Sequence, residues 1–274
     1  MRQSGVIGYN PVVPATLAFN LLAVATLVPA AVVALRRGQV PVALAALALG
    51  GAVAWTVLQL SGPWPTGFSA ALWLTIAATL AIGGALAAVD RRLMSLAILV
   101  FPYLAALGAL ATIWSRVPAS TGAVAPWTGW FVVHVLFAVA TYSLATLAAL
   151  AGVAVLIQQH ALKLRRQTAF SRLLPAVSVA EALEFRLLVA CEVVLGMGLA
   201  SGTAIEYVEQ GTGAVLDHKT VFSALAFIAI GFLLLAHRRS GLRGRRAAHW
   251  ALAGYLLLTL AYPGVKFVRD VLMT

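Results

Sequence analysis

The chain has 274 residues, of which 62% are hydrophobic and only 10% are charged. A soluble domain of this length needs more polar surface, so the composition excludes a soluble globular protein and predicts an all-α, polytopic membrane protein. The net charge of +11 does not indicate nucleic-acid binding, because the basic residues stand in short clusters between apolar runs. The single cysteine, Cys191, excludes an internal disulfide framework and a CxxC haem-attachment or thiol-redox motif.

Apolar segments follow one another along the whole chain, and each is near or above the ~20 residues that a bilayer crossing requires. We therefore expect one membrane domain, residues 1–274, built as a bundle of eight transmembrane helices. The first segment lacks a basic leader of any weight, so no cleavable signal peptide is predicted. The eight predicted spans are 14–35, 40–60, 69–89, 93–114, 129–158, 183–205, 219–237 and 247–268.

The basic residues are distributed unequally over the two sides of this arrangement. Fourteen of the 19 Lys and Arg residues lie on the side that holds the loops after the first, third, fifth and seventh spans, and five lie on the other side. Because cytoplasmic loops carry the excess of positive charge, we expect both termini at the outer, periplasmic face of a bacterial inner membrane. The longest link on the basic side, 159–182, is either an interfacial amphipathic helix ending near Pro175 or a basic loop.

Histidine is the residue type most informative about function. His134 and His218 open the fifth and seventh predicted spans from the outer side, whereas His237 closes the seventh at the basic side. A helix of 19 residues is about 28 Å long, so His218 and His237 cannot ligate the same metal. His134 and His218 share a depth and could bind an iron from both axial sides, although a histidine at a helix end also often caps or snorkels. His160 and His249 stand among basic residues and are assigned to the interfacial surface.

Other polar residues near these histidines have two interpretations each. Asp217 is predicted to cap the helix that begins at His218. The outer cations Lys219, Lys266 and Arg269 could pair with an anionic ligand such as a haem propionate, or with outer carboxylates of the chain itself.

The sixth predicted span carries ionisable residues and glycines. Arg186 and Glu192 lie within or beside it, and ionisable groups in a span usually face a polar interior. Gly196, Gly198 and Gly202 have the spacing of a close helix–helix contact, and that packing role is favoured for them.

Three stretches carry a resemblance to a known family. They are "HVLFAVATYSLATL" from His134, "FRLLVACEVVLGMGLASG" from Phe185, and "LLLAHRRSGLRGRRAAHWALAGYLLLTLAYPGVKF" from Leu233. In this order they resemble the cytochrome c assembly membrane proteins, a haem-handling superfamily, and within it a YpjD-like branch. The resemblance covers roughly residues 65–274.

The resemblance implies roles for two histidines. It places the family's outer haem ligand at His134 and its membrane histidine of the cytoplasmic side at His237. Two features depart from the family pattern. The outer loop before the seventh span lacks tryptophan and reads "DHKT" where the family has Asp-Pro-Lys-Glu-Thr, and the tail "KFVRDVLMT" lacks the family's second outer histidine. His218 is the remaining histidine at that depth and could replace it.

The function predicted on these grounds is haem handling in cytochrome c-type biogenesis, with haem bound near the outer face. The expected partners are the lipid bilayer, haem and other membrane or cytochrome assembly proteins. The sequence contains no nucleophile–base pair, P-loop or zinc motif, which favours a binding protein over an enzyme. The alternative is a cofactor-free accessory subunit that packs against a larger membrane complex. One observation separates the two hypotheses: the purified protein either shows a Soret band or does not.

Overall fold

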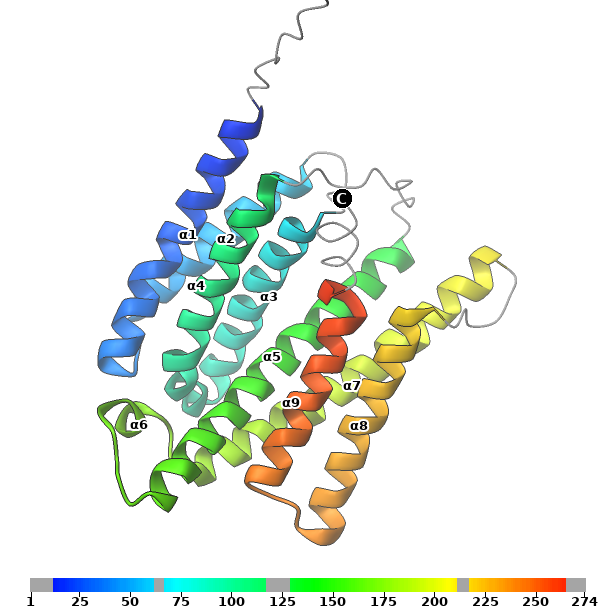
Figure 1. Cartoon of the computed structure of the whole chain (residues 1–274). Coiled ribbons are helices and arrows are strands. Elements are labelled where there is room, and N and C mark those ends of the chain that lie inside the picture. Colours follow the sequence, from blue (N-terminus) through cyan, green and yellow to red (C-terminus); the bar gives the residue numbers. More distant parts are fainter. Residues whose placement is uncertain (1–11, 62–66, 117–128, 211–216, 265–274) are drawn as a thin grey trace, which may run out of the picture.

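Helices make up the regular structure of this protein. The structure, a computed structural model, describes residues 12–61, 67–116, 129–210 and 217–264, and no strand occurs among them. This agrees with the predicted all-α class, because in lipid an isolated segment satisfies its backbone groups only as a helix. The helices form two neighbouring groups, one before and one after the gap at residues 117–128 (Figure 1).

The first group is a bundle of four long helices with a core of its own. Leu27, Trp73 and Leu104 are fully buried at its centre. Two of its helices contain an internal proline, which membrane helices tolerate because neighbouring groups satisfy the freed carbonyl. The elements are α1 (Val12–Arg37), α2 (Val42–Leu60), α3 (Phe68–Val89), the 3₁₀ helix η1 (Arg91–Leu96), α4 (Ala97–Ile113) and the 3₁₀ helix η2 (Trp114–Arg116).

The second group contains four long helices arranged as a ring. Its elements are α5 (Gly129–Lys163), the short α6 (Ala169–Leu173), α7 (Val177–Gln210), α8 (His218–Ser240), α9 (Arg245–Thr259) and the π turn η3 (Leu260–Gly264). Helix α5 packs against α7 and α9, and α8 packs against the same two helices. Helices α5 and α8 therefore lie diagonally across the ring (Figure 1).

Seven of the described helices are long and apolar enough to cross a membrane. The prediction of a polytopic helical membrane protein is thus confirmed, whereas the count of eight spans is not reproduced. The eighth predicted span, 247–268, corresponds to α9, which has only 15 residues before the π turn, and its last residues lie outside the described part. Helix α7 begins six residues before the predicted span, because the turn that carries Ser178 and Glu181 is still helical.

A buried asparagine joins three helices of the first group. The side-chain carbonyl of Asn20 accepts hydrogen bonds from the indole N–H of Trp73 at 2.6 Å and of Trp55 at 3.3 Å. Its amide donates to the carbonyl of Thr16. Asn20 is 1% exposed, so each of these groups would otherwise stay unpaired in an apolar interior. One side chain thereby fixes α1 against α2 and α3.

A chain of hydroxyl groups connects the two groups of helices. Thr259 donates to the carbonyl of Tyr255, so its oxygen is free to accept from the hydroxyl of Tyr142 at 3.2 Å. The Tyr142 hydroxyl also lies 3.2 Å from that of Tyr255, which in turn bonds to the hydroxyl of Tyr103 on α4. This chain satisfies four hydroxyls inside the bundle and ties α4 to α5 and α9.

An ion pair makes a second connection at the end of the bundle where α3 stops and α7 starts. Arg186 donates to Asp90 at 2.9 Å, with the two side chains 63% and 28% exposed. Such an exposed pair contributes little to stability. The hydroxyl chain and the surrounding apolar contacts therefore carry most of the contact between the two groups.

The asparagine contact leads to a stability prediction. Replacing Asn20 with Ala leaves two indole N–H groups without an acceptor, so we expect a loss of roughly 1–3 kcal/mol of unfolding free energy. The control is Thr75→Val, which removes only a hydrogen bond to a carbonyl of the same helix. The measurement is unfolding of the purified protein in detergent. Equal stability of the Asn20 and Thr75 variants would contradict the role given to Asn20.

Candidate functional site

Two histidines of the second group lie near opposite ends of the bundle. His134 stands in the second turn of α5, and His237 stands in the last turn of α8. Both are half-buried. In each ring, Nδ1 forms a hydrogen bond with a residue outside the histidine's own helix. The partner of Nδ1 determines whether Nε2 carries a proton or a lone pair.

His134, at the end of the bundle predicted to face outward, takes part in a directed hydrogen-bond relay. Its Nδ1 lies 2.9 Å from the hydroxyl of Ser201 on α7, and that hydroxyl donates to the carbonyl of Gly198 at 2.9 Å. A carbonyl only accepts, so the Ser201 proton is committed to Gly198 and its oxygen accepts from the Nδ1–H of His134. In the neutral ring the lone pair is therefore on Nε2. This is the tautomer of a histidine that binds a metal through Nε2.

Glycine on α7 lets the His134 ring lie close to that helix. A Cβ atom at position 202 would come within 3.0 Å of the ring carbon Cε1 of His134. Trp130, one turn earlier on α5, donates its indole N–H to the carbonyl of Ser201 at 3.3 Å. Gly202 was predicted to serve a helix contact, and Ser201 was not predicted as a site residue because no feature of the sequence pairs it with His134.

The other predicted outer residues are placed as follows. His218 and Lys219 are the first two residues of α8, and both are exposed. Phe227 of α8 lies against Gly196 of α7. His218 precedes Phe227 by nine residues, whereas Ser201, the partner of His134, follows Gly196 by five. His218 therefore lies about one helical turn, roughly 5 Å, closer to that end of the bundle than His134. The two come from diagonal helices, and their pairing stays a prediction. The remaining candidates, Lys266 and Arg269, lie outside the described residues, among which no group of three or more potential metal ligands occurs.

The predicted cap of α8 is confirmed. The Asp217 carboxylate accepts from the backbone N–H of Thr220 at 2.8 Å and from its hydroxyl at 2.9 Å. Burial by itself would raise the pKa of Asp217, but these bonds, together with nearby Lys219 and His218, outweigh it and lower the pKa. The cap therefore stabilises α8 above the ordinary carboxyl pKa, and the stabilisation is lost only as the pH falls through the lowered value.

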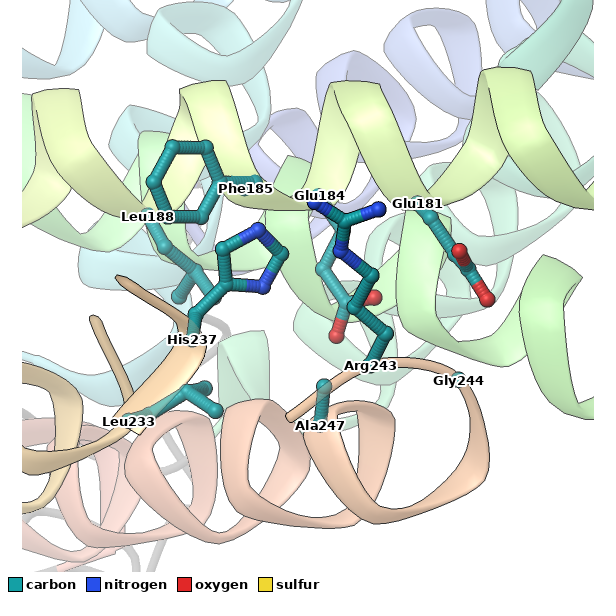
Figure 2. Close-up of a pocket in the computed structure, with 9 residues that line it drawn as sticks. All are labelled: Glu181, Glu184, Phe185, Leu188, Leu233, His237, Arg243, Gly244 and Ala247. Atoms are coloured by element: carbon teal, nitrogen blue, oxygen red, sulfur yellow. The ribbon is translucent and has the colours of Figure 1, made fainter. Parts of the chain in front are cut away.

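His237, at the end of the bundle predicted to face the cytoplasm, lines a pocket between α7, α8 and the start of α9 (Figure 2). Its Nδ1 lies 3.0 Å from the carbonyl of Leu242 and must donate to it, which again leaves Nε2 with the lone pair in the neutral ring. The ring stacks on Phe185 with centroids 4.2 Å apart. Arg243 and Gly244 line the same pocket, whose cavity volume is about 10 Å³.

A buried carboxyl group faces this pocket. Glu184 is 3% exposed, and its Oε1 has no hydrogen-bond partner among the described residues. A Cβ atom at Gly152 of α5 would lie 3.2 Å from that oxygen, so the glycine leaves room for it. A buried unpaired carboxyl oxygen indicates a ligand or water at this position. Glu184 was not predicted as a site residue, because it stands at the very edge of the predicted sixth span.

A second carboxyl group lies deeper in the same helix. Glu192 has one oxygen without a partner among the described residues, and its other oxygen lies 2.8 Å from the position of a Cβ atom at Gly231 of α8. Its polar head is thus placed between α7 and α8. This agrees with the expectation that an ionisable residue in a span faces the interior of the bundle.

These features describe a multi-pass membrane protein with half-buried histidines near its two ends. The family model described as "Cytochrome C assembly protein" matches residues 39–273, so the chain belongs to the cytochrome c assembly family. A protein of Azospirillum brasilense, described as "Uncharacterized 28.8 kDa protein in nifR3-like 5'region", is 44% identical over 264 residues. The match covers 93% of this chain and 97% of that relative. No solved structure matches the chain.

The relay at His134 predicts a defined tautomer. In protein carrying ¹⁵N-labelled histidine, we expect the solid-state NMR signal of His134 to report a protonated Nδ1 and an unprotonated Nε2. Ser201→Ala should shift that signal, because the acceptor is lost. Ser143→Ala, a matched change of a buried hydroxyl that has no partner among the described residues, should leave it unchanged. A protonated Nε2 in the unaltered protein would refute the relay.

Proposed function

We propose that this protein binds and handles haem during cytochrome c-type biogenesis, in a bacterial inner membrane. The observation that carries the proposal is shared by His134 and His237: the Nδ1 of each is engaged by a hydrogen bond, which leaves Nε2 for a ligand. Haem iron takes axial imidazole ligands, and a partner on the other ring nitrogen fixes the orientation of such a ligand. Membership of the cytochrome c assembly family also supports a role in haem handling.

The side chains that line the inner pocket include the kinds of group that bind haem. His237 offers the imidazole nitrogen, Leu188 and Leu233 supply apolar surface, and Arg243 is an exposed cation that can pair with a propionate. Cofactor sites usually have volumes of about 300–1,000 Å³, so a macrocycle needs more room than this pocket has. The link between α8 and α9, which also holds His237 through Leu242, is the part of the wall that we expect to move.

The outer site is proposed around His134. In this proposal His218 replaces the missing second outer ligand, and Lys219, Lys266 and Arg269 are available for the anionic groups of haem. The proposed topology has both termini outside, with α9 and the residues after it forming the eighth span. The exposed position of His218 at the start of α8 leaves its ring accessible to a ligand.

The inner site can be tested by haem content. We expect His237→Ala to lower the haem that the protein acquires in cells, because the inner ligand is lost, while the outer site still takes up haem added to the purified protein. The control is His249→Ala, since His249 is exposed near the same end of the bundle and bonds only to a carbonyl of its own helix. Equal haem content in the two variants would contradict the inner role of His237.

The outer site can be tested by the spin state of the iron. With two imidazole ligands the iron should be six-coordinate and low-spin. Replacing either His134 or His218 with Ala should make it high-spin or remove the haem, and both variants should behave alike. Asp217→Asn should do neither, because Asn also caps a helix. Absence of a Soret band from the unaltered protein would favour the cofactor-free accessory subunit instead.

A further inference from the structure

The hairpin of α8 and α9 carries positive charge that no carboxylate of its own offsets. Five arginines lie between residues 238 and 246, and the whole stretch from 218 to 264 contains neither Asp nor Glu. The five are exposed, and within the described part of the chain the ion pair Arg186–Asp90 is the only one. These arginines are Arg238, Arg239, Arg243, Arg245 and Arg246.

An exposed apolar stripe runs toward these arginines. On α8 the stripe consists of Ile228, Phe232 and Leu235, spaced three or four residues apart and therefore on one face. Four residues after Leu235, the same face reaches Arg239.

One exposed aromatic residue of α9 adjoins this stripe. Trp250 is exposed, and Arg246 precedes it by four residues on the same face. The rings of Phe232 and Trp250 lie 5.4 Å apart, so Trp250 extends the apolar surface of α8 sideways at this aromatic pair. One arginine from each helix thus stands at the charged end of a joint apolar surface.

Helix stability does not account for this pattern. Arg245 and Arg246 occupy the first turn of α9, where the positive end of the helix dipole disfavours cations. The positive-inside preference requires basic residues near the span, but it does not require them to continue the face that carries the apolar stripe of α8 and Trp250 of α9.

We propose that this face of the hairpin is a binding site for an anionic phospholipid. The lipid phosphate lies between Arg239 and Arg246, and an acyl chain lies along Phe232 and Trp250. The charge of the arginines selects the head group, since basic residues next to a membrane span attract anionic lipid. The site does not depend on haem binding, because it uses the lipid-facing side of the hairpin.

Native mass spectrometry of the purified protein tests this proposal directly. The protein is released from micelles that contain equal amounts of phosphatidylglycerol and phosphatidylcholine, and the fraction bound to each lipid is measured. We expect phosphatidylglycerol to be retained preferentially. Arg239→Gln combined with Arg246→Gln should reduce that preference about thirtyfold, which corresponds to about 1 kcal/mol for each arginine near an anionic surface.

Two further variants separate this site from general charge effects. Arg239→Lys with Arg246→Lys keeps both charges and should retain most of the preference. Arg36→Gln with Arg37→Gln removes two exposed arginines at the end of α1 and should leave it unchanged. Equal retention of the two lipids by the unaltered protein, loss in the lysine variant equal to that in the glutamine variant, or an equal loss in the α1 variant would each overturn the proposal.

Discussion

The hydrocarbon core of a lipid bilayer offers no hydrogen-bond partner to a polar group, so polar groups inside the bundle must pair with one another. In the first group of helices, Asn20 satisfies two indole N–H groups from neighbouring helices. Between the groups, tyrosine hydroxyls satisfy one another in a chain that begins at Tyr103. In the second group, His134 is satisfied by Ser201. Among the described residues one oxygen of the Glu184 carboxyl group has no partner, and this group lines the pocket at His237.

Glycines on neighbouring helices make room for the polar side chains of the second group. Gly202 lets the ring of His134 lie against α7, and Gly152 leaves space beside the carboxyl group of Glu184. Gly231 does the same for Glu192. Small residues in membrane helices permit close packing of backbones, and here the space that they leave is filled by ionisable groups. The glycines therefore determine where the candidate functional groups can point.

The elements that depend on local sequence could be predicted. Long apolar runs indicated the helices to within a few residues, and an Asp directly before such a run indicated the cap at Asp217. The last predicted span, 247–268, is helical as far as the structure describes it, first as α9 and then as the π turn that begins at Leu260, and its last residues lie outside the described part. The start of α7 was predicted six residues too late, because the turn that carries Ser178 and Glu181 is still helical.

Contacts between helices could not be predicted, since they depend on which faces meet. Nothing in the sequence around Ser201 pairs it with His134, 67 residues away. Tyr103 and Tyr255 are separated by 152 residues and meet only because the two groups of helices lie side by side (Figure 1). The histidines were found because their residue type is rare in a membrane span. The partners that fix their tautomers emerged only from the packing of the helices.

The central claim is that this bundle holds haem iron through histidine Nε2 atoms. Pulsed EPR of the ferric protein, prepared with ¹⁴N- or ¹⁵N-labelled histidine, measures that bond directly. The account predicts a hyperfine coupling that changes with the histidine isotope and disappears when His134, His218 and His237 are all replaced by Ala. An iron signal that is insensitive to the histidine isotope, or a coupling that persists in the triple variant, would contradict it.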